Sequence, residues 1–451
     1  MLALNRPLST PSNGVWRLPA SLRAYAYSTL IEPSGNPSVP PPWRPSTALD
    51  EWVERDARPI SLRQLTFFGR TLTDSRLLSS ANYVRQELPT RLAHRLRNMQ
   101  TLPYTALTNH HIGYVYELYY SAFERLRKVP DIRTLDDNDR FCEVIKLCLT
   151  EHLTVIPRLA MGVLEIQGSI SQDECDKFMK TLLRSRISRR VIAEQHLALT
   201  ETFHSPWHFP NAKHSQIVAA EDDFVGEIFL KCNATEIITK CADLARDIAF
   251  KAYGPSVPVP EVVLNGHLDT TFPYIPSHLE YILGELLRNS IQAVMDKHTA
   301  GDPRPPPIEV LICGAAQHVI IRISDRGGGI DREILPFLWS FAKGPRRDQR
   351  LRNLSSVPRL AGTMQELQFP SANANSTETD RYNGTLRTLS GRPPDLRLGM
   401  GLPMSKIYAE YWAGNLELHS LEGYGTDAFL QISRLGNKNE QLSTRAAMDA
   451  L

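Results

Sequence analysis

Four polar residues recur at intervals of three and four within residues 276–298, PSHLEYILGELLRNSIQAVMDKH: Tyr281, Glu285, Asn289 and Gln292. In a helix this spacing places their side chains on one face. A carboxylate one turn from a carboxamide suits a proton acceptor beside a cation that is bound through oxygen. The solvated face of an ordinary amphipathic helix shows the same spacing, so the stripe alone only suggests a site.

A second candidate group follows the alternating run HVIIRISD. Asp325 ends this run and is followed at once by RGGGI. An ionised Asp only accepts hydrogen bonds, so it suits an exocyclic amine such as adenine N6. Successive glycines let a ligand approach the chain closely. This stretch therefore suggests a place for a nucleotide base.

Two glycine motifs lie further along the chain. LGMGLPMSK places Gly399 and Gly401 before a helix with Pro403 in its first turn, where free N–H groups and the helix dipole favour a phosphate. GYGTD adds Thr426, whose hydroxyl could support the edge of adenine. Each motif alone is also typical of a plain turn. The chain has no GxxxxGKS/T and no HRD or DFG set, which excludes the common P-loop and eukaryotic kinase folds.

The elements that must position these residues fall into two groups. Residues 48–200 show apolar residues at a helical period almost throughout, and this predicts four long amphipathic helices in an antiparallel bundle. The period breaks around residues 201–226. Beyond it, 276–298 also carries an apolar stripe that would pack on a sheet, IEVLICG and HVIIRISD read as one hairpin, and NLELHS and DAFLQIS as another. The fold class is therefore α followed by an α/β sandwich. The apolar stripe consists of Leu279, Ile282, Leu283, Leu286, Ala293 and Val294.

Composition narrows the remaining choices. Apolar residues make up 42% of the 451 residues, and Lys plus Arg exceed Asp plus Glu by only 51 − 49 = 2, so we expect no nucleic-acid partner. No run approaches the roughly 18 apolar residues of a spanning helix, so no membrane span is expected. The six cysteines lack metal-ligand spacing, and Cys142 and Cys148 are expected to be buried free thiols.

The N-terminal residues resemble a targeting segment. Residues 1–31 are rich in Arg and Ser and contain no Asp or Glu, which is typical of a mitochondrial transit peptide. A disordered tail is the alternative. The expected organisation is a transit peptide at 1–31, a Pro-rich linker at 32–47, a helical domain at 48–205, an α/β domain at 213–436 with a long polar segment at 345–396, and a tail at 437–451.

Taken in order, ELLRN, DRGGG, GMGLP and GYGTD resemble the N-box and glycine boxes of the GHKL (Bergerat) ATP-binding fold of type II topoisomerases, Hsp90-like chaperones and histidine kinases. Within that group, the chain is similar to the mitochondrial 2-oxoacid dehydrogenase kinases over about residues 55–435. The motifs that carry this resemblance are RQELPTRLAHR, SRISRR, FPYIPSHLEYILGELLRNS, ISDRGGGI, GLPMSKIYAEYWAG and SLEGYGTD.

The resemblance implies a role for each matching residue. Glu285 would be the general base for a substrate serine and Asn289 the Mg²⁺ ligand, whereas Arg288 is expected to pack or pair outward. The cofactors implied are ATP and Mg²⁺, with K⁺ as a candidate further ion. The nucleotide-binding residues would be Glu285, Asn289, Gln292, Asp325, Gly327, Gly329, Leu398, Gly399, Met400, Gly401, Leu402 and Thr426.

Four residues of the helical half form a second candidate site: Tyr119, His152, Arg186 and Arg190. An Arg pair four residues apart can grip a carboxylate, although spacing alone favours a solvated charged face. The resemblance implies a regulatory pocket for 2-oxoacids, in which a carboxylate bound to Arg186 and Arg190 inhibits the kinase.

The chain departs from the pyruvate dehydrogenase kinases at several points. Position 281 is Tyr, where those enzymes carry His and the branched-chain kinase carries Tyr. Gly344-Pro345 replaces a Ser-Thr pair, the polar segment 345–396 is long, and the C-terminus lacks an Asp-Trp tail. These differences lean toward the branched-chain kinase.

The function expected from the resemblance is that of a mitochondrial matrix protein-serine kinase that inactivates the E1α subunit of a pyruvate or branched-chain 2-oxoacid dehydrogenase complex. The resemblance also implies that residues 48–205 form a regulatory and lipoyl-docking domain, and that residues 213–436 form the ATP-binding domain with a long lid at 345–396. The lipoyl domain of E2 is the expected docking partner, and a homodimer is expected. The alternatives are a histidine kinase, although no His-Glu phosphoacceptor pattern lies on a dimerisation hairpin, and a GHKL ATPase clamp, which needs a transducer domain.

Overall fold

A computed structural model describes residues 47–69, 72–204, 224–254, 257–298, 304–344, 346–357, 359–360, 397–434, 436 and 438–440. The predicted transit peptide, almost all of the Pro-rich linker, most of the predicted lid and residues 441–451 lie outside this set.

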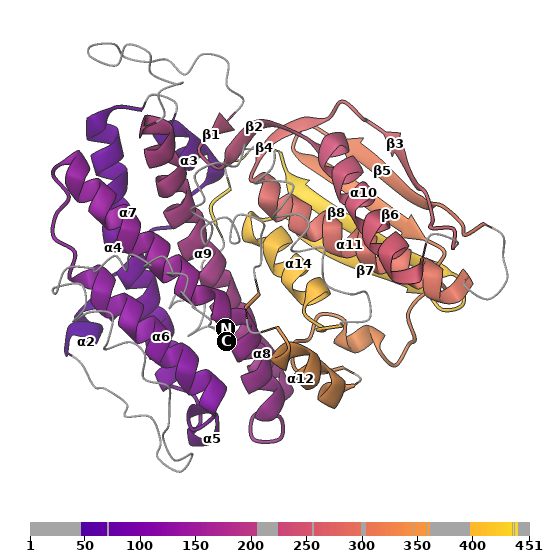
Figure 1. Ribbon diagram of the computed structural model, residues 1–451, viewed down its shortest axis with the longest axis horizontal. Helices are drawn as coiled ribbons and strands as arrows, with labels where there is room; N and C mark the ends of the chain where they lie inside the picture. Colours follow the sequence, from indigo (N-terminus) through magenta and orange to yellow (C-terminus); the bar gives the residue numbers. More distant parts are fainter. Residues whose placement is uncertain are drawn as a thin grey trace, which may run out of the picture. The chain divides into compact units, whose positions relative to one another are not determined.

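The first half of the described chain is helical, as predicted (Figure 1). Helix α4 packs against both α6 and α9, and α6 packs against α8, so the long helices share one apolar core. Cys142 and Cys148 are buried free thiols in this core, as expected. The elements are α2 (Thr47–Val53), α3 (Leu62–Gly69), α4 (Asp74–Gln100), α5 (Tyr104–Leu107), α6 (His110–Arg127), α7 (Leu135–Glu151), η1 (His152–Thr154), α8 (Val155–Glu165) and α9 (Gln172–His204).

Local sequence explains where α7 begins, and a short 3₁₀ turn follows its end. Thr134 caps its first turn by accepting from the N–H of Asp137, and Asp137 in turn accepts from the N–H of Thr134, which forms a capping box. At His152 the chain tightens into the 3₁₀ turn η1 before α8 begins. The continuous helical pattern seen in the sequence is therefore divided at His152, one of the predicted pocket residues.

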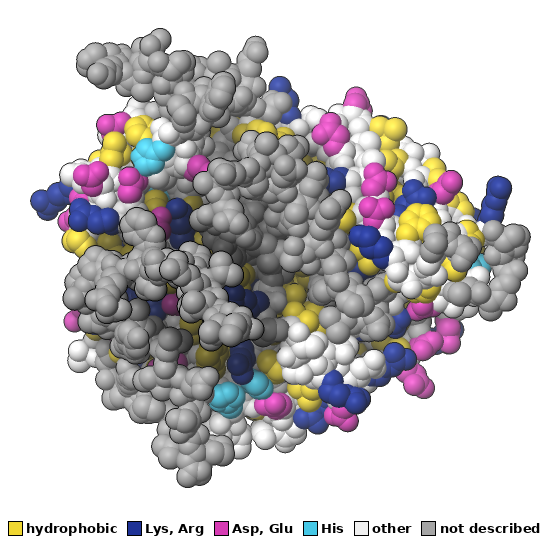
Figure 2. Space-filling view, viewed as in Figure 1, with side chains coloured by type: hydrophobic (Ala, Val, Ile, Leu, Met, Phe, Trp, Pro, Cys, Tyr) yellow, Lys and Arg dark blue, Asp and Glu magenta, His cyan; other side chains and the backbone are white. Residues whose placement is uncertain are grey.

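One described stretch, Leu135–Glu165, is long and apolar enough to cross a membrane by length and composition. In its most apolar window 72% of the residues are buried inside the protein, and the core helices of soluble proteins pass the same test. The described part of the face in Figure 2 carries Lys and Arg side chains interspersed with Asp and Glu.

The second half is an α/β sandwich, as predicted. Its main sheet has the strand order β3-β5-β6-β8-β7, with β3 and β5 parallel and the other pairs antiparallel. Both predicted hairpins are present, as β5–β6 and β7–β8. The elements are β1 (Phe224–Val225), β2 (Ile228–Asn233), α10 (Ala234–Tyr253), β3 (Val262–Gly266), β4 (Thr271–Tyr274), α11 (Pro276–His298), β5 (Ile308–Gly314), β6 (His318–Asp325), η2 (Leu335–Phe337), α12 (Arg347–Ser355), α14 (Gly401–Tyr411), β7 (Asn415–Leu421) and β8 (Gly425–Ser433).

Helices α10, α11 and α14 form a layer on the sheet (Figure 1). Helix α11 packs on β6 and on both neighbouring helices, because its apolar stripe faces them. Five of the six predicted stripe residues are buried, and the sixth, Ala293, is half-buried against the loop after β6. Helix α11 therefore lies against the end of β6, where Asp325 is found.

Candidate active site

Glu285 lies at the junction of two predicted motifs. Its carboxylate is buried and accepts from Arg288 Nη2 at 2.6 Å. The expectation that Arg288 pairs outward is therefore wrong: one turn of helix turns its guanidinium back onto the carboxylate. A Cβ atom at Gly401 would overlap Glu285 Oε2, so the carboxylate lies directly against the first residue of α14.

Asp325 is buried at the end of β6 and is already held by two donors. Ser290 Oγ of α11 donates to Oδ2 at 3.0 Å, and the N–H of Gly327 donates to Oδ1 at 2.9 Å. Burial raises the pKa of the Asp325 carboxyl above its ordinary value, and these two hydrogen bonds oppose that rise. The backbone of Thr426 acts on the carboxylate in the same direction, and an ionised carboxylate with about four acceptor positions can still accept from an adenine amine. Ser290 was not predicted, because a Ser on a helix gives no signal of its own.

The glycines around Asp325 are needed for close packing. A Cβ at Gly327 would overlap Ala293 of α11, and one at Gly425 would overlap the carbonyl oxygen of Asp325. Gly329 has a φ of +74°, which only glycine adopts readily, and lies against Leu421. Thr426 pairs with Asp325 across β6 and β8, as its predicted role requires.

The phosphate-loop candidates precede α14. Leu398 and Met400 are buried, Gly399 has a φ of +68°, and Leu402 is half-buried in the first turn. The N-cap residue Met400 makes no side-chain hydrogen bond to the first turn, so within the described residues the N–H groups of Gly401 and Leu402 suit an anion.

Arg350, which the sequence analysis did not single out, supports this loop from α12. Its buried guanidinium donates to the carbonyl oxygens of Phe341 at 2.8 Å and Lys343 at 3.2 Å, and of Leu398 at 3.3 Å and Gly399 at 3.4 Å. Helix α12 lies at the start of the predicted lid segment, so this part of that segment is ordered by Arg350.

The chemistry of the donor set fits a magnesium nucleotide. Asn289 and Gln292 are half-buried on the same face of α11 as Glu285. No group of three His, Cys, Asp or Glu in the described chain could hold a metal ion by itself. Mg²⁺ bound with nucleotides commonly takes only one or two protein ligands and fills its remaining positions with phosphate oxygens and water. The carboxamide oxygen of Asn289 would supply one such ligand.

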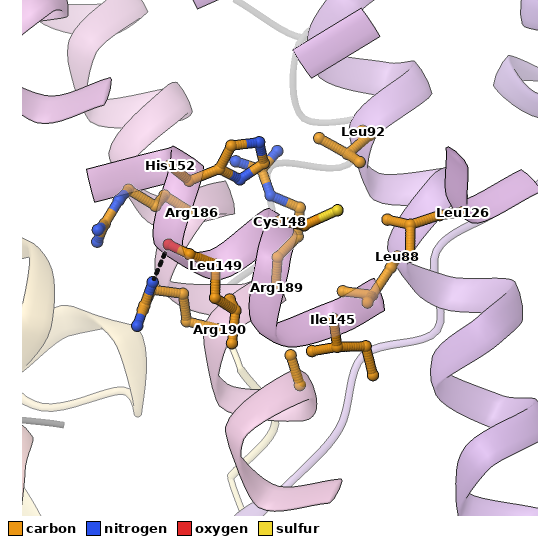
Figure 3. A pocket seen from close by; sticks show the side chains of 11 residues that line it. Leu88, Leu92, Leu126, Ile145, Cys148, Leu149, His152, Arg186, Arg189 and Arg190 are labelled. Atoms are coloured by element: carbon orange, nitrogen blue, oxygen red, sulfur yellow. Dashed lines mark hydrogen bonds between the residues drawn. The ribbon is translucent and has the colours of Figure 1, made fainter. Parts of the chain in front are cut away.

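The predicted regulatory residues also come together. His152, Arg186 and Arg190 line one cavity of about 30 Å³ in the helical bundle (Figure 3). Tyr119 packs its ring against His152, with 5.2 Å between the ring centroids. The side chains of all four are buried, so a solvated charged face, the alternative from spacing, is wrong. The cavity has one further cationic lining residue, Arg189, which was not predicted.

Electrostatics in this cavity are dominated by cations. Burial, followed by the charges of Arg189, Arg186 and Arg190, holds the pKa of His152 well below its ordinary value. Arg190 donates to the carbonyl oxygen of Leu149 at 3.3 Å and pairs with Glu194 at 2.6 Å. His152 is therefore neutral near pH 7, in a cavity whose net charge is positive.

The fold and the first of these sites define the chain as a protein with an ATP-binding domain of the GHKL class. The family described as histidine kinase-, DNA gyrase B-, and HSP90-like ATPase matches residues 274–435, and the family described as mitochondrial branched-chain alpha-ketoacid dehydrogenase kinase matches residues 59–229.

Similarity to named proteins extends over both the helical half and the α/β half of the chain. The chain is 32% identical to a mitochondrial pyruvate dehydrogenase (acetyl-transferring) kinase 2 of Saccharomyces cerevisiae, across 87% of this chain and 85% of that protein. It is 32% identical to a mitochondrial pyruvate dehydrogenase kinase of Arabidopsis thaliana, across 85% of this chain and 92% of that protein. Isozyme 4 of Homo sapiens is 27% identical, across 84% and 82%. The chain belongs to the mitochondrial 2-oxoacid dehydrogenase kinase family, whose members are ATP-dependent protein kinases.

Proposed function

We propose that this protein phosphorylates a serine of the E1α subunit of the mitochondrial pyruvate dehydrogenase complex and thereby inactivates it. The observation that carries the proposal is the contact between Glu285 and Gly401, because it puts a buried carboxylate beside the helix N-terminus that suits a phosphate. Transfer to a hydroxyl requires a proton acceptor beside the transferred phosphoryl group.

Each candidate residue has one task in this proposal. Glu285 accepts the proton of the serine hydroxyl, Asn289 holds Mg²⁺, and Asp325 accepts from the adenine amine. Bound Mg²⁺ neutralises charge on the triphosphate. Arg288 holds the Glu285 carboxylate in place until the hydroxyl arrives, since the two side chains lie 2.6 Å apart. The first N–H groups of α14 and the turn at Gly399 receive the phosphates. K⁺ remains a candidate further ion for this site.

The substrate assignment follows the relatives. The named relatives above are pyruvate dehydrogenase kinases. Tyr281, which suggested the branched-chain kinase, packs on Tyr408 of α14 with 5.1 Å between ring centroids. This packing favours neither substrate, so the closeness to the branched-chain kinase stays a prediction.

We also propose where the kinase is located, which proteins it binds and what inhibits it. The acid-poor residues 1–31 would direct the chain to the mitochondrial matrix. The helical half would dock the lipoyl domain of E2, and two copies would form a homodimer, as the family resemblance implies. A 2-oxoacid bound through its carboxylate to Arg186 and Arg190 would inhibit transfer, and unchanged inhibition of an Arg190→Ala variant would refute this.

Replacing Glu285 by Gln tests the catalytic assignment. The carboxamide cannot accept a proton, so single-turnover transfer to the E1α serine should fall by roughly 10²–10⁴-fold. Binding of ADP with Mg²⁺, measured by calorimetry on the same preparation, should change little. Asn289→Ala should show the converse, with weakened binding of the magnesium nucleotide.

Glu280→Gln is the matched control on the same helix. Glu280 is a buried carboxylate that pairs with Lys240 at 3.2 Å on another side of α11. Its loss should leave transfer within a few-fold of the unmodified protein. Equal transfer by Glu285→Gln and by the unmodified protein would exclude Glu285 as the base.

A further inference from the structure

Two buried guanidinium groups of the helical bundle, on the packed helices α4 and α9, have no carboxylate partner among the described residues. Arg95 of α4 and Arg189 of α9 are each only 4% exposed. In the described part of the chain, neither forms an ion pair, and four of their side-chain nitrogens have no hydrogen-bond partner. These atoms are Nε and Nη1 of Arg95 and Nη1 and Nη2 of Arg189.

The position of Arg189 ties this pair to the cavity already described. Its guanidinium lies over the ring of Tyr119 at 4.4 Å, and its side chain lines the cavity beside His152 (Figure 3). Arg189 is near the Tyr119 hydroxyl, but the two do not reach hydrogen-bond geometry. Arg95 lies one turn of α4 beyond Arg91, which donates to the carbonyl oxygen and the hydroxyl of Ser188, the residue before Arg189 on α9. The packing of α4 on α9 therefore brings Arg95 near the side of the cavity that Arg189 lines.

Burial without a counter-charge is the main consequence of this arrangement. The pKa of Arg95 is lowered to about 10, first by burial and then by the charge of Arg189. The pKa of Arg189 is lowered by burial as well; Tyr119 opposes this shift, and the charges of Arg186 and Arg91 add to it. Buried charges in proteins are normally paired, because an unpaired one loses its hydration without compensation. Buried guanidinium donors that have no partner therefore suit an anion.

We propose that Arg95, Arg189 and Tyr119 form a second anion subsite next to Arg186 and Arg190, so that the regulatory ligand of this cavity is a small dicarboxylate, of the 2-oxodicarboxylic acid class. One carboxylate is held by Arg186 and Arg190, and the other lies between Arg189 and Arg95. The inference rests on the proposed regulatory role of the cavity and extends it to the charge of the ligand. A monocarboxylate would leave the Arg95–Arg189 pair unneutralised.

The size of the cavity adds a condition. A volume of about 30 Å³ holds little more than water, since one water needs roughly 10–15 Å³ on this measure. The ligand must therefore displace side chains that line the cavity. His152 lies in the turn η1, and the next residue, Leu153, accepts at its carbonyl oxygen from the N–H of Leu360 at 3.1 Å. Opening of the cavity at this turn would thus reach Leu360, which lies within the predicted lid segment.

Calorimetry with two matched ligands tests the charge of the ligand. 2-Oxoglutarate and 2-oxovalerate have the same five-carbon 2-oxo chain, and only the first carries a second carboxylate. The purified full-length chain should bind 2-oxoglutarate at least about tenfold more tightly, since hydrogen bonds to charged groups are worth that much or more. Arg189→Met and Arg95→Met should each remove most of this preference while leaving the affinity for 2-oxovalerate within a few-fold.

Lys177→Met is the matched control, because Lys177 is an exposed cation on the same helix as Arg189. It should keep the preference. Equal affinity of the unmodified chain for both ligands would overturn the second subsite, and this result needs no variant to fold. A preference that survives in both Met variants would also overturn it. Failure of both ligands to bind would instead refute the oxoacid pocket itself, and none of these results depends on kinase activity.

Discussion

Two arginines one turn apart on α4 differ in whether the protein supplies a counter-charge for the buried guanidinium. Arg91 and Arg95 are both almost fully buried. Arg91 pairs with Glu440 at 2.8 Å and with Glu87 at 3.2 Å, and it donates to Ser188 Oγ of α9 at 2.5 Å. Among the described residues, Arg95 forms no ion pair, and its Nε and Nη1 atoms have no hydrogen-bond partner.

The difference is visible in the proton affinity of the two groups. The carboxylate of Glu440, together with Tyr411, Tyr83 and Glu87, raises the pKa of Arg91 despite its burial. Burial and Arg189 lower the pKa of Arg95 to about 10. A buried charge that the protein neutralises itself serves structure, whereas one that it leaves unneutralised is suited to a ligand.

Glu440 makes Arg91 a connection between distant parts of the chain. It accepts from the N–H of Ile60 at 3.2 Å and from the hydroxyl of Tyr411 in α14. The C-terminal segment, the helical bundle and the helix after the phosphate loop therefore meet at one carboxylate. We expect this cluster to hold the two halves together.

Breaking the ion pair between Arg91 and Glu440 should have the largest effect on stability. Glu440→Met leaves Arg91 without its closest counter-charge, so the free energy of unfolding should fall by about 3–5 kcal/mol. Urea unfolding of the full-length chain measures this. The double variant Arg91→Met, Glu440→Met should recover at least half of the loss, because it removes both charges. A loss below about 1 kcal/mol in Glu440→Met would contradict the role given to this cluster.

Removing the charge of Arg189 should change the free energy of unfolding in the opposite direction. Without ligand, Arg189→Met eliminates an unpaired buried cation, so the free energy of unfolding should rise by about 1–3 kcal/mol. The measurement is urea unfolding in a buffer free of carboxylates and phosphate. A clear destabilisation by Arg189→Met would show that Arg189 is a structural residue, and the contrast with Arg91 would fail.

The smallest expected effect is on the pH dependence of the free energy of unfolding. The pKa of His152 in the folded state is well below its ordinary 6.5, so the folded state takes up this proton less readily than the unfolded state. The stability from His152 is therefore fully present above pH 6.5 and is lost as pH falls from there toward the folded-state pKa, by at most about 1.4 kcal/mol per pH unit.

The His152→Asn variant separates the contribution of His152 from that of other histidines whose pKa is lowered, such as His196. Unfolding free energies at about pH 7 and pH 5.5 should differ less in the variant than in the unmodified chain. Arg189→Met should also reduce the difference, because it removes one of the charges that face His152 together with Arg186 and Arg190. Identical pH dependence in all three proteins would exclude the cation cluster as the cause.

The sequence predicts the parts of the site that depend on local spacing. Glu285 and Asn289 share a helix face whatever packs around them, and Asp325 ends a strand that alternation alone identifies. The glycine motifs and both hairpins follow from short stretches in the same way.

What the sequence could not predict depends on contacts between distant residues. Arg350 and Ser290 support the phosphate loop and Asp325, yet each looks like an ordinary helical residue. Arg95 and Arg189 sit in basic stretches, RLAHRLR and SRISRR, that also suit a solvated face. Only the packing of α4 against α9 shows that both are buried. Arg288 was misjudged because periodicity gives the face of a helix but not the rotamer of a long side chain.

The most direct test of the proposed kinase is to supply it with its substrate. The purified chain and Mg·ATP are incubated with purified pyruvate dehydrogenase complex and, separately, with the branched-chain complex, and phosphorylated residues are located by mass spectrometry. The proposal predicts phosphoserine on E1α of the pyruvate complex, loss of that complex's activity, and no such product with Glu285→Gln. Phosphoserine on the branched-chain E1α alone would move the substrate to that complex. ATP hydrolysis without phosphoprotein, or acid-labile phosphohistidine on the chain itself, would contradict the proposed function.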